Sequence, residues 1–271
     1  MRGIARAVVL LVLVLVWLAA CSTTTTTTTG PLSDVRPTPG AAPDEGDAKR
    51  RAQVRLELAA AYFGRNQMDV ALQEVNRALA ADANLVAGYN LRGLINANLG
   101  KEKQAEDDFR RALTLNARDV DALQNYGWFL CQHKRYAEGN VQFTQALAAL
   151  QRRDPSRILL AQGVCHAFAG QLDEAEKALQ RSYQADPTNP STSVNLAEVL
   201  LRRGEADRAR FHIRRVNANP AFVSAQTLWL AARIEQKLGN RTGVQELGKQ
   251  LTTRFRETRE ATAFEQGKFD E

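Results

Sequence analysis

The chain has 271 residues, of which 44% are hydrophobic and 24% are charged, an ordinary composition for a globular protein. Its net charge of +6 falls to +4 without Arg2 and Arg6, because 34 lysines and arginines and 30 acidic residues then remain. A positive charge this small and this evenly spread argues against a nucleic-acid-binding protein.

Residues 1–20 have the pattern of a secretory signal. Arg2 and Arg6 give a basic start, and residues 7–18 form a 12-residue apolar run that is too short to span a bilayer comfortably. The signal ends in Leu18-Ala19-Ala20-Cys21, which resembles a bacterial lipobox. An ordinary cleaved signal and an uncleaved anchor are the alternatives.

The lipobox resemblance implies cleavage before Cys21, with a diacylglycerol on its sulfur and an acyl chain on its new amino group. Several acyl chains anchor a protein stably where one chain binds only marginally. Because Ser22 rather than aspartate follows the cysteine, the outer membrane is the expected location. This covalent lipid is the only non-protein group expected, and no cofactor is.

Residues 21–51 are predicted to form a tether. Seven consecutive threonines (residues 23–29) precede Pro31, Pro37, Pro39 and Pro43, and no apolar period runs through the segment. A flexible chain of this length reaches roughly 30 Å. The folded part is therefore expected to stand off the membrane surface.

Residues 52–257 repeat one pattern six times. The repeats start at Ala52, Val86, Val120, Ser156, Pro190 and Ser224, and every spacing is 34 residues except for a two-residue insertion at Asp154-Pro155. The eighth and twentieth positions of all six repeats are glycine or alanine, which lets two helices cross closely. Near the fifteenth position stand residues that tolerate a left-handed turn, namely Asn66, Gly100, Gly170, Gly204 and Gly239.

This 34-residue period resembles the tetratricopeptide repeat. The resemblance implies an all-α superhelical solenoid of six helix–turn–helix repeats, each of which buries its apolar face against its neighbours. Residues 258–271 are then expected to be a C-terminal cap or tail.

Cys131 and Cys165 fall at positions 12 and 10 of consecutive repeats, on helices expected to pack side by side. Facing positions on adjacent helices can bring two Cα atoms within about 7 Å, as a disulfide requires. The secretion signal favours such a bond, which would stabilise the fold by roughly 3–4 kcal/mol. Two free buried thiols are the alternative.

A metal site or catalytic nucleophile at these cysteines is disfavoured, although His133 and His166 lie close in sequence. Residues one or two apart on a helix point in different directions, so neither histidine is placed to share a site with its cysteine. No other catalytic, metal-binding or phosphate-binding motif occurs in the sequence. The chain is therefore not expected to be an enzyme or to have a small-molecule substrate.

In tetratricopeptide repeats, fixed positions of the first helix line a concave groove. Carried onto this chain, those positions predict a partner-binding groove of Leu56, Phe63, Asn90, Leu94, Gln124 and Trp128, with Val164 and Phe168 following in the fourth repeat. A groove this apolar suits an amphipathic helix or an extended apolar peptide. The alternative is that Phe63 and Trp128 only complete the packing between repeats.

The run Asn125-Tyr126-Gly127-Trp128-Phe129-Leu130-Cys131, together with Cys165, the lipobox, the tether and six repeats, resembles the type IV pilus biogenesis and stability lipoproteins, the PilW/PilF family. The resemblance implies a pilotin, which helps the pilus secretin reach the outer membrane and multimerise and so supports pilus assembly and twitching motility. The secretin subunit would be the protein partner. The alternative is another repeat-type lipoprotein that serves outer-membrane protein assembly or adapts a periplasmic protease.

Overall fold

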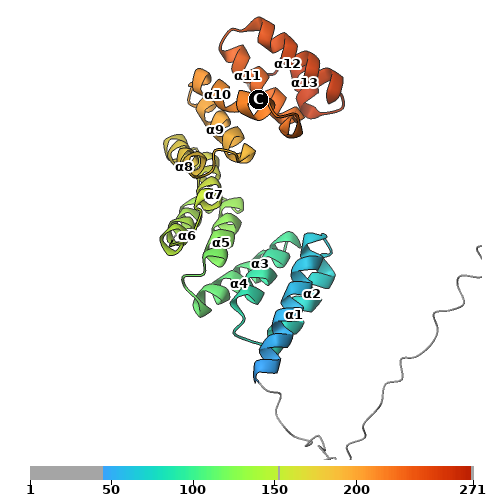
Figure 1. The fold of residues 1–271 in the computed structure, drawn as a ribbon, viewed down its shortest axis with the longest axis vertical. Coiled ribbons are helices and arrows are strands. Elements are labelled where there is room, and N and C mark those ends of the chain that lie inside the picture. Colours follow the sequence, from blue (N-terminus) through green and yellow to red (C-terminus); the bar gives the residue numbers. More distant parts are fainter. Residues whose placement is uncertain (1–44, 152, 270–271) are drawn as a thin grey trace, which may run out of the picture. The chain divides into compact units, whose positions relative to one another are not determined.

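The structure is a computed structural model that describes residues 45–151 and 153–269. The described residues form helices and turns without a strand (Figure 1). The expected signal (residues 1–20), the lipidated Cys21 and most of the expected tether lie outside the described residues. The helices are α1 (Glu45–Gly64), α2 (Met68–Ala81), α3 (Val86–Asn98), α4 (Glu102–Leu115), α5 (Val120–Gln132), α6 (Tyr136–Ala149), α7 (Ser156–Phe168), α8 (Leu172–Ala185), α9 (Pro190–Arg202), α10 (Ala206–Asn217), the short 3-10 helix η1 (Pro220–Phe222), α11 (Ala225–Lys237), α12 (Arg241–Arg254) and α13 (Arg259–Glu265).

The helices pair as antiparallel hairpins that stack along the chain. Each odd-numbered helix from α1 to α11, here called helix A, packs against the even-numbered helix B that follows it. Each helix B also contacts the next helix A, and successive helices A contact one another. The last helix, α13, packs against α11 and α12 and caps the stack. The all-α tetratricopeptide arrangement predicted from the sequence is confirmed.

Close helix crossings explain why small residues recur within each repeat. A Cβ atom on Gly139 of α6 would lie 2.8 Å from the carbonyl oxygen of Gly127 on α5, a backbone atom that cannot move alone. A Cβ atom on Gly127 would likewise lie 3.1 Å from the carbonyl oxygen of Gly139. Any side chain at either position would therefore push α5 and α6 apart.

The turns between helices A and B match the sequence prediction except in the third repeat. Asn66 and the four glycines at the expected turn positions all have positive φ. In the third repeat this conformation falls on Lys134, with φ 61°, which the sequence pattern does not predict. A lysine in a left-handed turn is strained relative to glycine, so the flanking helix pair must hold it there.

The first helix begins earlier than the predicted repeat. Helix α1 starts at Glu45, whereas the predicted tether extends to residue 51 and the first repeat starts at Ala52. Glu45 and Asp47 lie in the first turn, where negative charge suits the helix dipole, and Glu45 pairs with Lys49 at 2.8 Å. No helix in the described part of the chain is long and apolar enough to cross a membrane.

Glu106 on α4 links the second repeat to the third. Its carboxylate accepts hydrogen bonds from the Tyr126 hydroxyl at 2.8 Å and from Arg135 Nη1 at 2.7 Å. Burial raises the pKa of Glu106, but the bonds from Arg135 and Tyr126 outweigh burial and hold that pKa below its ordinary value. Glu176 on α8 makes the equivalent link between repeats four and five, because it pairs with Arg208 at 2.6 Å.

Replacing Glu106 with glutamine is expected to lower the free energy of unfolding by about 2 kcal/mol at pH 7, since hydrogen bonds to a charged group are lost. Because the folded pKa of Glu106 lies below its unfolded value, this stabilisation is present above pH ~4.5 and is lost as the pH falls through the folded pKa. Urea unfolding of both proteins at pH 7 and pH 3 measures the difference. It should shrink at pH 3, and an equal difference at both pH values would contradict the assignment.

The matched control is Glu174→Gln. Glu174 pairs with Lys177 at 2.8 Å, but both side chains are exposed. Exposed pairs contribute little to stability, so this variant should unfold like the wild type at either pH.

Candidate peptide-binding groove

A depression of about 420 Å³ lies on the helix-A face of the middle repeats. Three consecutive helices A, α5, α7 and α9, contribute its walls. Its size falls within the range of ligand-binding pockets in proteins. We call it the central groove, and it is lined by Gln124, Asn125, Trp128, Arg157, Leu160, Ala161, Val164 and Asn195.

Helical periodicity brings the groove residues of α7 onto one face. Arg157, Leu160, Ala161 and Val164 are spaced by three or four residues, so they form a single stripe along the helix. Trp128 faces this stripe from α5, and its ring centroid lies 6.5 Å from that of Phe168, which is 58% exposed. The groove is therefore an apolar surface with an aromatic wall.

The structure brings three of the predicted groove residues, Gln124, Trp128 and Val164, into the central groove. Asn90 lies next to it, because the Asn125 side-chain amide donates a hydrogen bond to Asn90 Oδ1 at 3.1 Å. Phe168, which was also predicted, packs on Trp128 outside this lining, and the remaining predicted residues belong to the packing of the first two repeats. Leu94 packs against the cluster around Phe109, and Phe63 packs against the first core cluster.

Leu56 requires a correction. It is only 9% exposed and belongs to the buried cluster that also contains Leu91 and Ile95 of α3. Helix α1 contacts α3 directly, and this neighbour covers the position that was predicted to face a partner. We therefore leave Leu56 out of the proposed binding surface.

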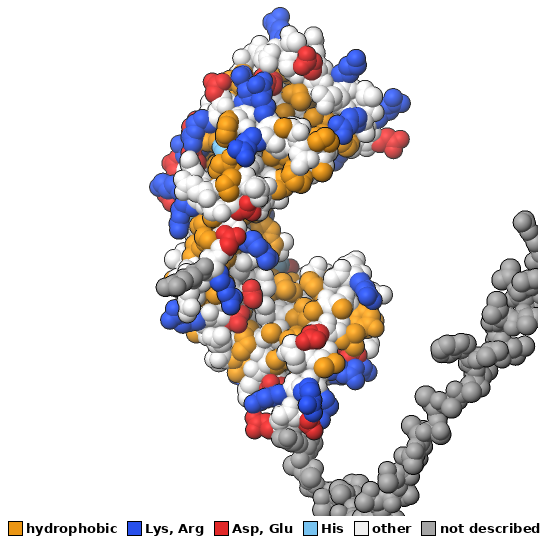
Figure 2. Space-filling view, viewed as in Figure 1, with side chains coloured by type: hydrophobic (Ala, Val, Ile, Leu, Met, Phe, Trp, Pro, Cys, Tyr) orange, Lys and Arg blue, Asp and Glu red, His pale blue; other side chains and the backbone are white. Residues whose placement is uncertain are grey.

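Several groove residues were not predicted from the sequence. Leu160 stands at position five of its repeat, the position that gave the predicted groove residues Leu56, Asn90 and Gln124, so the signal for it was present. Arg157 stands at position two, where no groove residue was predicted. Asn125 and Asn195 both stand at position six, a column that the prediction did not use. Figure 2 shows one face of the molecule, on which hydrophobic side chains are exposed over several repeats between charged ones.

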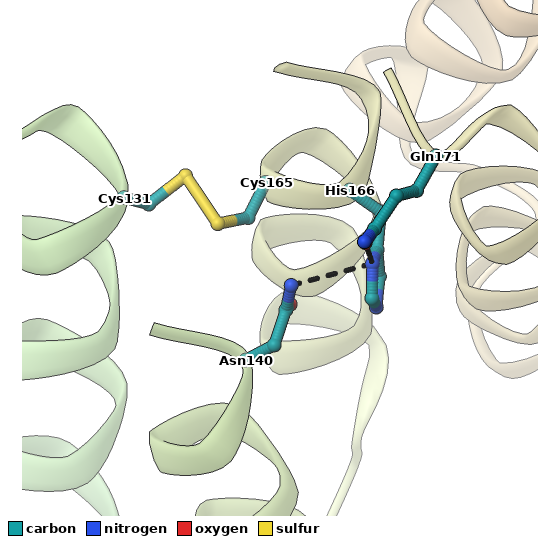
Figure 3. Close-up of a disulfide and its surroundings, with 5 residues drawn as sticks. All are labelled: Cys131, Asn140, Cys165, His166 and Gln171. Atoms are coloured by element: carbon teal, nitrogen blue, oxygen red, sulfur yellow. Dashed lines mark hydrogen bonds between the residues drawn. A yellow bond between two sulfur atoms is a disulfide. The ribbon is translucent and has the colours of Figure 1, made fainter. Parts of the chain in front are cut away.

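Cys131 of α5 and Cys165 of α7 form a disulfide in the structure (Figure 3), with their Cα atoms 5.7 Å apart. This separation lies within the range that disulfides need. Both residues are buried in one core cluster with Phe143. The bond joins the same two helices that carry most of the central groove. Oxidation of the pair in the cell stays a prediction.

The histidines near these cysteines have polar partners of their own. His166 Nδ1 lies 2.7 Å from Gln171 Oε1 and 3.3 Å from Asn140 Nδ2, on the side of α7 turned away from the disulfide (Figure 3). His133 packs against the ring of Phe129 with centroids 4.4 Å apart. Within the residues described here, no three His, Cys, Asp or Glu side chains are grouped so as to hold a metal ion.

Comparison with known proteins gives a consistent family. Residues 49–219 match the family model described as tetratricopeptide repeat. Over 209 residues, 77% of this chain and 82% of the relative, the sequence is 24% identical to the type IV pilus assembly protein PilF of Pseudomonas aeruginosa. The crystal structure of PilW, described as a widely conserved type IV pilus biogenesis factor, superimposes with a TM-score of 0.74 at 28% identity, covering 78% of this chain and 97% of PilW. The solved structure of Pseudomonas aeruginosa PilF has the same fold, with a TM-score of 0.72 at 21% identity over 81% of this chain and 99% of PilF.

Proposed function

The chain belongs to the tetratricopeptide repeat family, and on this premise we propose that it acts in type IV pilus biogenesis as a pilotin of the pilus secretin. The observation that carries the proposal is its similarity to PilF and PilW along about three quarters of its length, repeats and groove included. In this role the chain binds another protein and performs no chemistry of its own. It binds neither nucleic acid nor a small-molecule substrate.

The proposed mechanism is escort of an aggregation-prone subunit. The lipid on Cys21 supplies the membrane affinity that directs the chain to the outer membrane, with the repeats on its periplasmic side. The central groove covers an apolar segment of the secretin subunit during transit. The apolar walls formed by Trp128, Leu160 and Val164 support this assignment, because an exposed apolar surface in a repeat protein is typical of a partner-binding site.

A deletion strain tests the proposal. Heat-resistant secretin multimers in separated outer membranes are expected to be lost, or to appear in the inner membrane, and wild-type chain should restore them. Cys21→Ala should fail to restore them even when the variant accumulates at wild-type levels, because without the acyl chains it has no anchor.

Other outcomes would change the assignment. Normal multimers with missing or unstable pili would move the role from secretin assembly to stabilisation of the fibre. Normal multimers and normal pili together would overturn the pilus assignment and favour an adaptor for outer-membrane protein assembly or for a protease. Restoration by Cys21→Ala would show that the lipid anchor is dispensable.

A further inference from the structure

The central groove has a single charged side chain in its lining, the guanidinium of Arg157. The other seven lining residues are apolar or carry neutral amides, and no carboxylate is among them. Arg157 is exposed and, within the described residues, has no hydrogen bond or ion pair. Arg135, Arg203 and Arg208, by contrast, each pair with at least two carboxylates. The groove therefore presents an unneutralised positive charge beside an apolar surface.

Helix stability does not account for an arginine at this point. Arg157 lies in the first turn of α7, which contains no acidic residue. The helix dipole places partial positive charge at this end, so a cation here is unfavourable and an anion is favourable. Asp154, just before the helix, already accepts hydrogen bonds from the Ser156 backbone amide at 2.9 Å and from the Ser156 hydroxyl at 2.7 Å. The attraction of a further carboxylate to this end of the groove therefore comes from the Arg157 guanidinium.

The chain itself shows how its helix-A face holds an aromatic segment. The ring of Phe269 packs on Trp229 of α11, with centroids 5.2 Å apart. Arg233, four residues further along α11, donates from Nε to the carbonyl oxygen of Phe269 at 3.2 Å. On α11, therefore, an aromatic ring contacts the side chain of the C-terminal segment, and a guanidinium one turn further along binds a backbone oxygen of the same segment. The central groove has the same two side-chain types on neighbouring helices A, with Trp128 on α5 and Arg157 on α7.

We propose that the central groove selects segments in which an apolar side chain lies within a few residues of an aspartate or glutamate. The apolar side chain fits between Trp128, Leu160 and Val164, and the carboxylate pairs with Arg157. A guanidinium binds a carboxylate through two parallel hydrogen bonds, which adds directional selectivity to the apolar contact. This inference rests on the proposed function, because it names the chemistry of the segment that the groove would hold.

A phage-displayed library of random dodecapeptides, panned against the full-length chain, tests the selectivity. Wild-type chain should enrich peptides with Asp or Glu near a large apolar residue. Arg157→Gln should lose the acidic preference and keep the apolar one. The matched control is Arg181→Gln on helix B of the same repeat, and it should behave as the wild type. Arg181 is exposed and has no ion pair or hydrogen bond in the part of the chain that the structure describes.

Titration of one selected peptide measures how much Arg157 contributes to its affinity. Arg157→Gln should raise its Kd about fivefold, as expected for a solvent-accessible ion pair. Replacing the peptide's Asp or Glu by the amide should have the same effect on the wild type and no further effect on Arg157→Gln. Added salt should weaken the wild-type complex more than the variant complex.

Two outcomes would overturn the inference, and only the second would also overturn the escort mechanism. If binding of the selected peptides depends on Trp128 but the Arg157→Gln protein still prefers acidic peptides, Arg157 does not bind the peptide carboxylate. The groove then remains the binding site. If Trp128→Ala leaves peptide binding unchanged, the central groove is not the peptide site, and the escort mechanism proposed above fails with it.

Discussion

Replacing Trp128 with aspartate is expected to raise the Kd for the secretin's periplasmic portion by roughly 30- to 1,000-fold, the range for loss of an aromatic binding hot spot. The reason is that Trp128 forms the aromatic wall of the central groove, and a carboxylate there would have to lose water against apolar residues. Isothermal titration with the purified secretin portion measures the change. In cells, the variant should fail to restore heat-resistant multimers to the deletion strain.

The fold of the variant must be checked, because Trp128 also packs against the core cluster around Phe143. Circular dichroism and thermal unfolding serve that purpose, and Trp128→Ala provides a milder second variant. Phe211→Asp is the matched control, since Phe211 is 56% exposed on helix α10 and lies outside the groove lining. Wild-type affinity in a folded Trp128→Asp protein would show that the secretin binds elsewhere.

The repeat architecture could be predicted from sequence because it depends on columns of small residues at fixed spacing. The predicted starts Val86, Val120, Ser156 and Pro190 are the first residues of helices α3, α5, α7 and α9. The last repeat differs by one residue, because Ser224 is the cap of α11 and accepts a hydrogen bond from the Thr227 backbone amide. Helices A and B cross closely in every repeat, so small residues are required at the same positions each time. A single sequence therefore shows the pattern of small residues several times.

Features that occur once could not be predicted in this way. The early start of α1 depends on acidic residues in one helix turn, and the left-handed Lys134 has no distinguishing residue type. The groove was predicted only in part. The prediction applied the same positions to every repeat and took no account of differences between the repeats at the ends of the stack and those in the middle. Leu56 lies in the first repeat, where contact with α3 covers it, whereas Leu160 stands at the same position of the fourth repeat and lines the central groove.

Removing the disulfide is expected to lower the free energy of unfolding by about 3–4 kcal/mol, because the bond closes a 34-residue loop in the unfolded chain. The double variant Cys131→Ala and Cys165→Ala tests this by urea unfolding. The wild type in reductant should lose the same amount, and reductant should not change the double variant. Labelling of the denatured Cys21→Ala protein should find no free thiol before reduction and two afterwards. Two free thiols before reduction would contradict the disulfide.

The loss of stability on removing the disulfide should be confined to nearby repeats, since each repeat in a solenoid is stabilised chiefly by its neighbours. Amide hydrogen exchange in the double variant should accelerate in α5 to α8 and stay near wild-type rates in α1, α2, α11 and α12. The same local loosening should weaken peptide binding, because Trp128 and Val164 lie on the two helices that the disulfide joins. Acceleration spread evenly over all six repeats would instead indicate that the array unfolds as one cooperative unit and that the bond stabilises the whole stack.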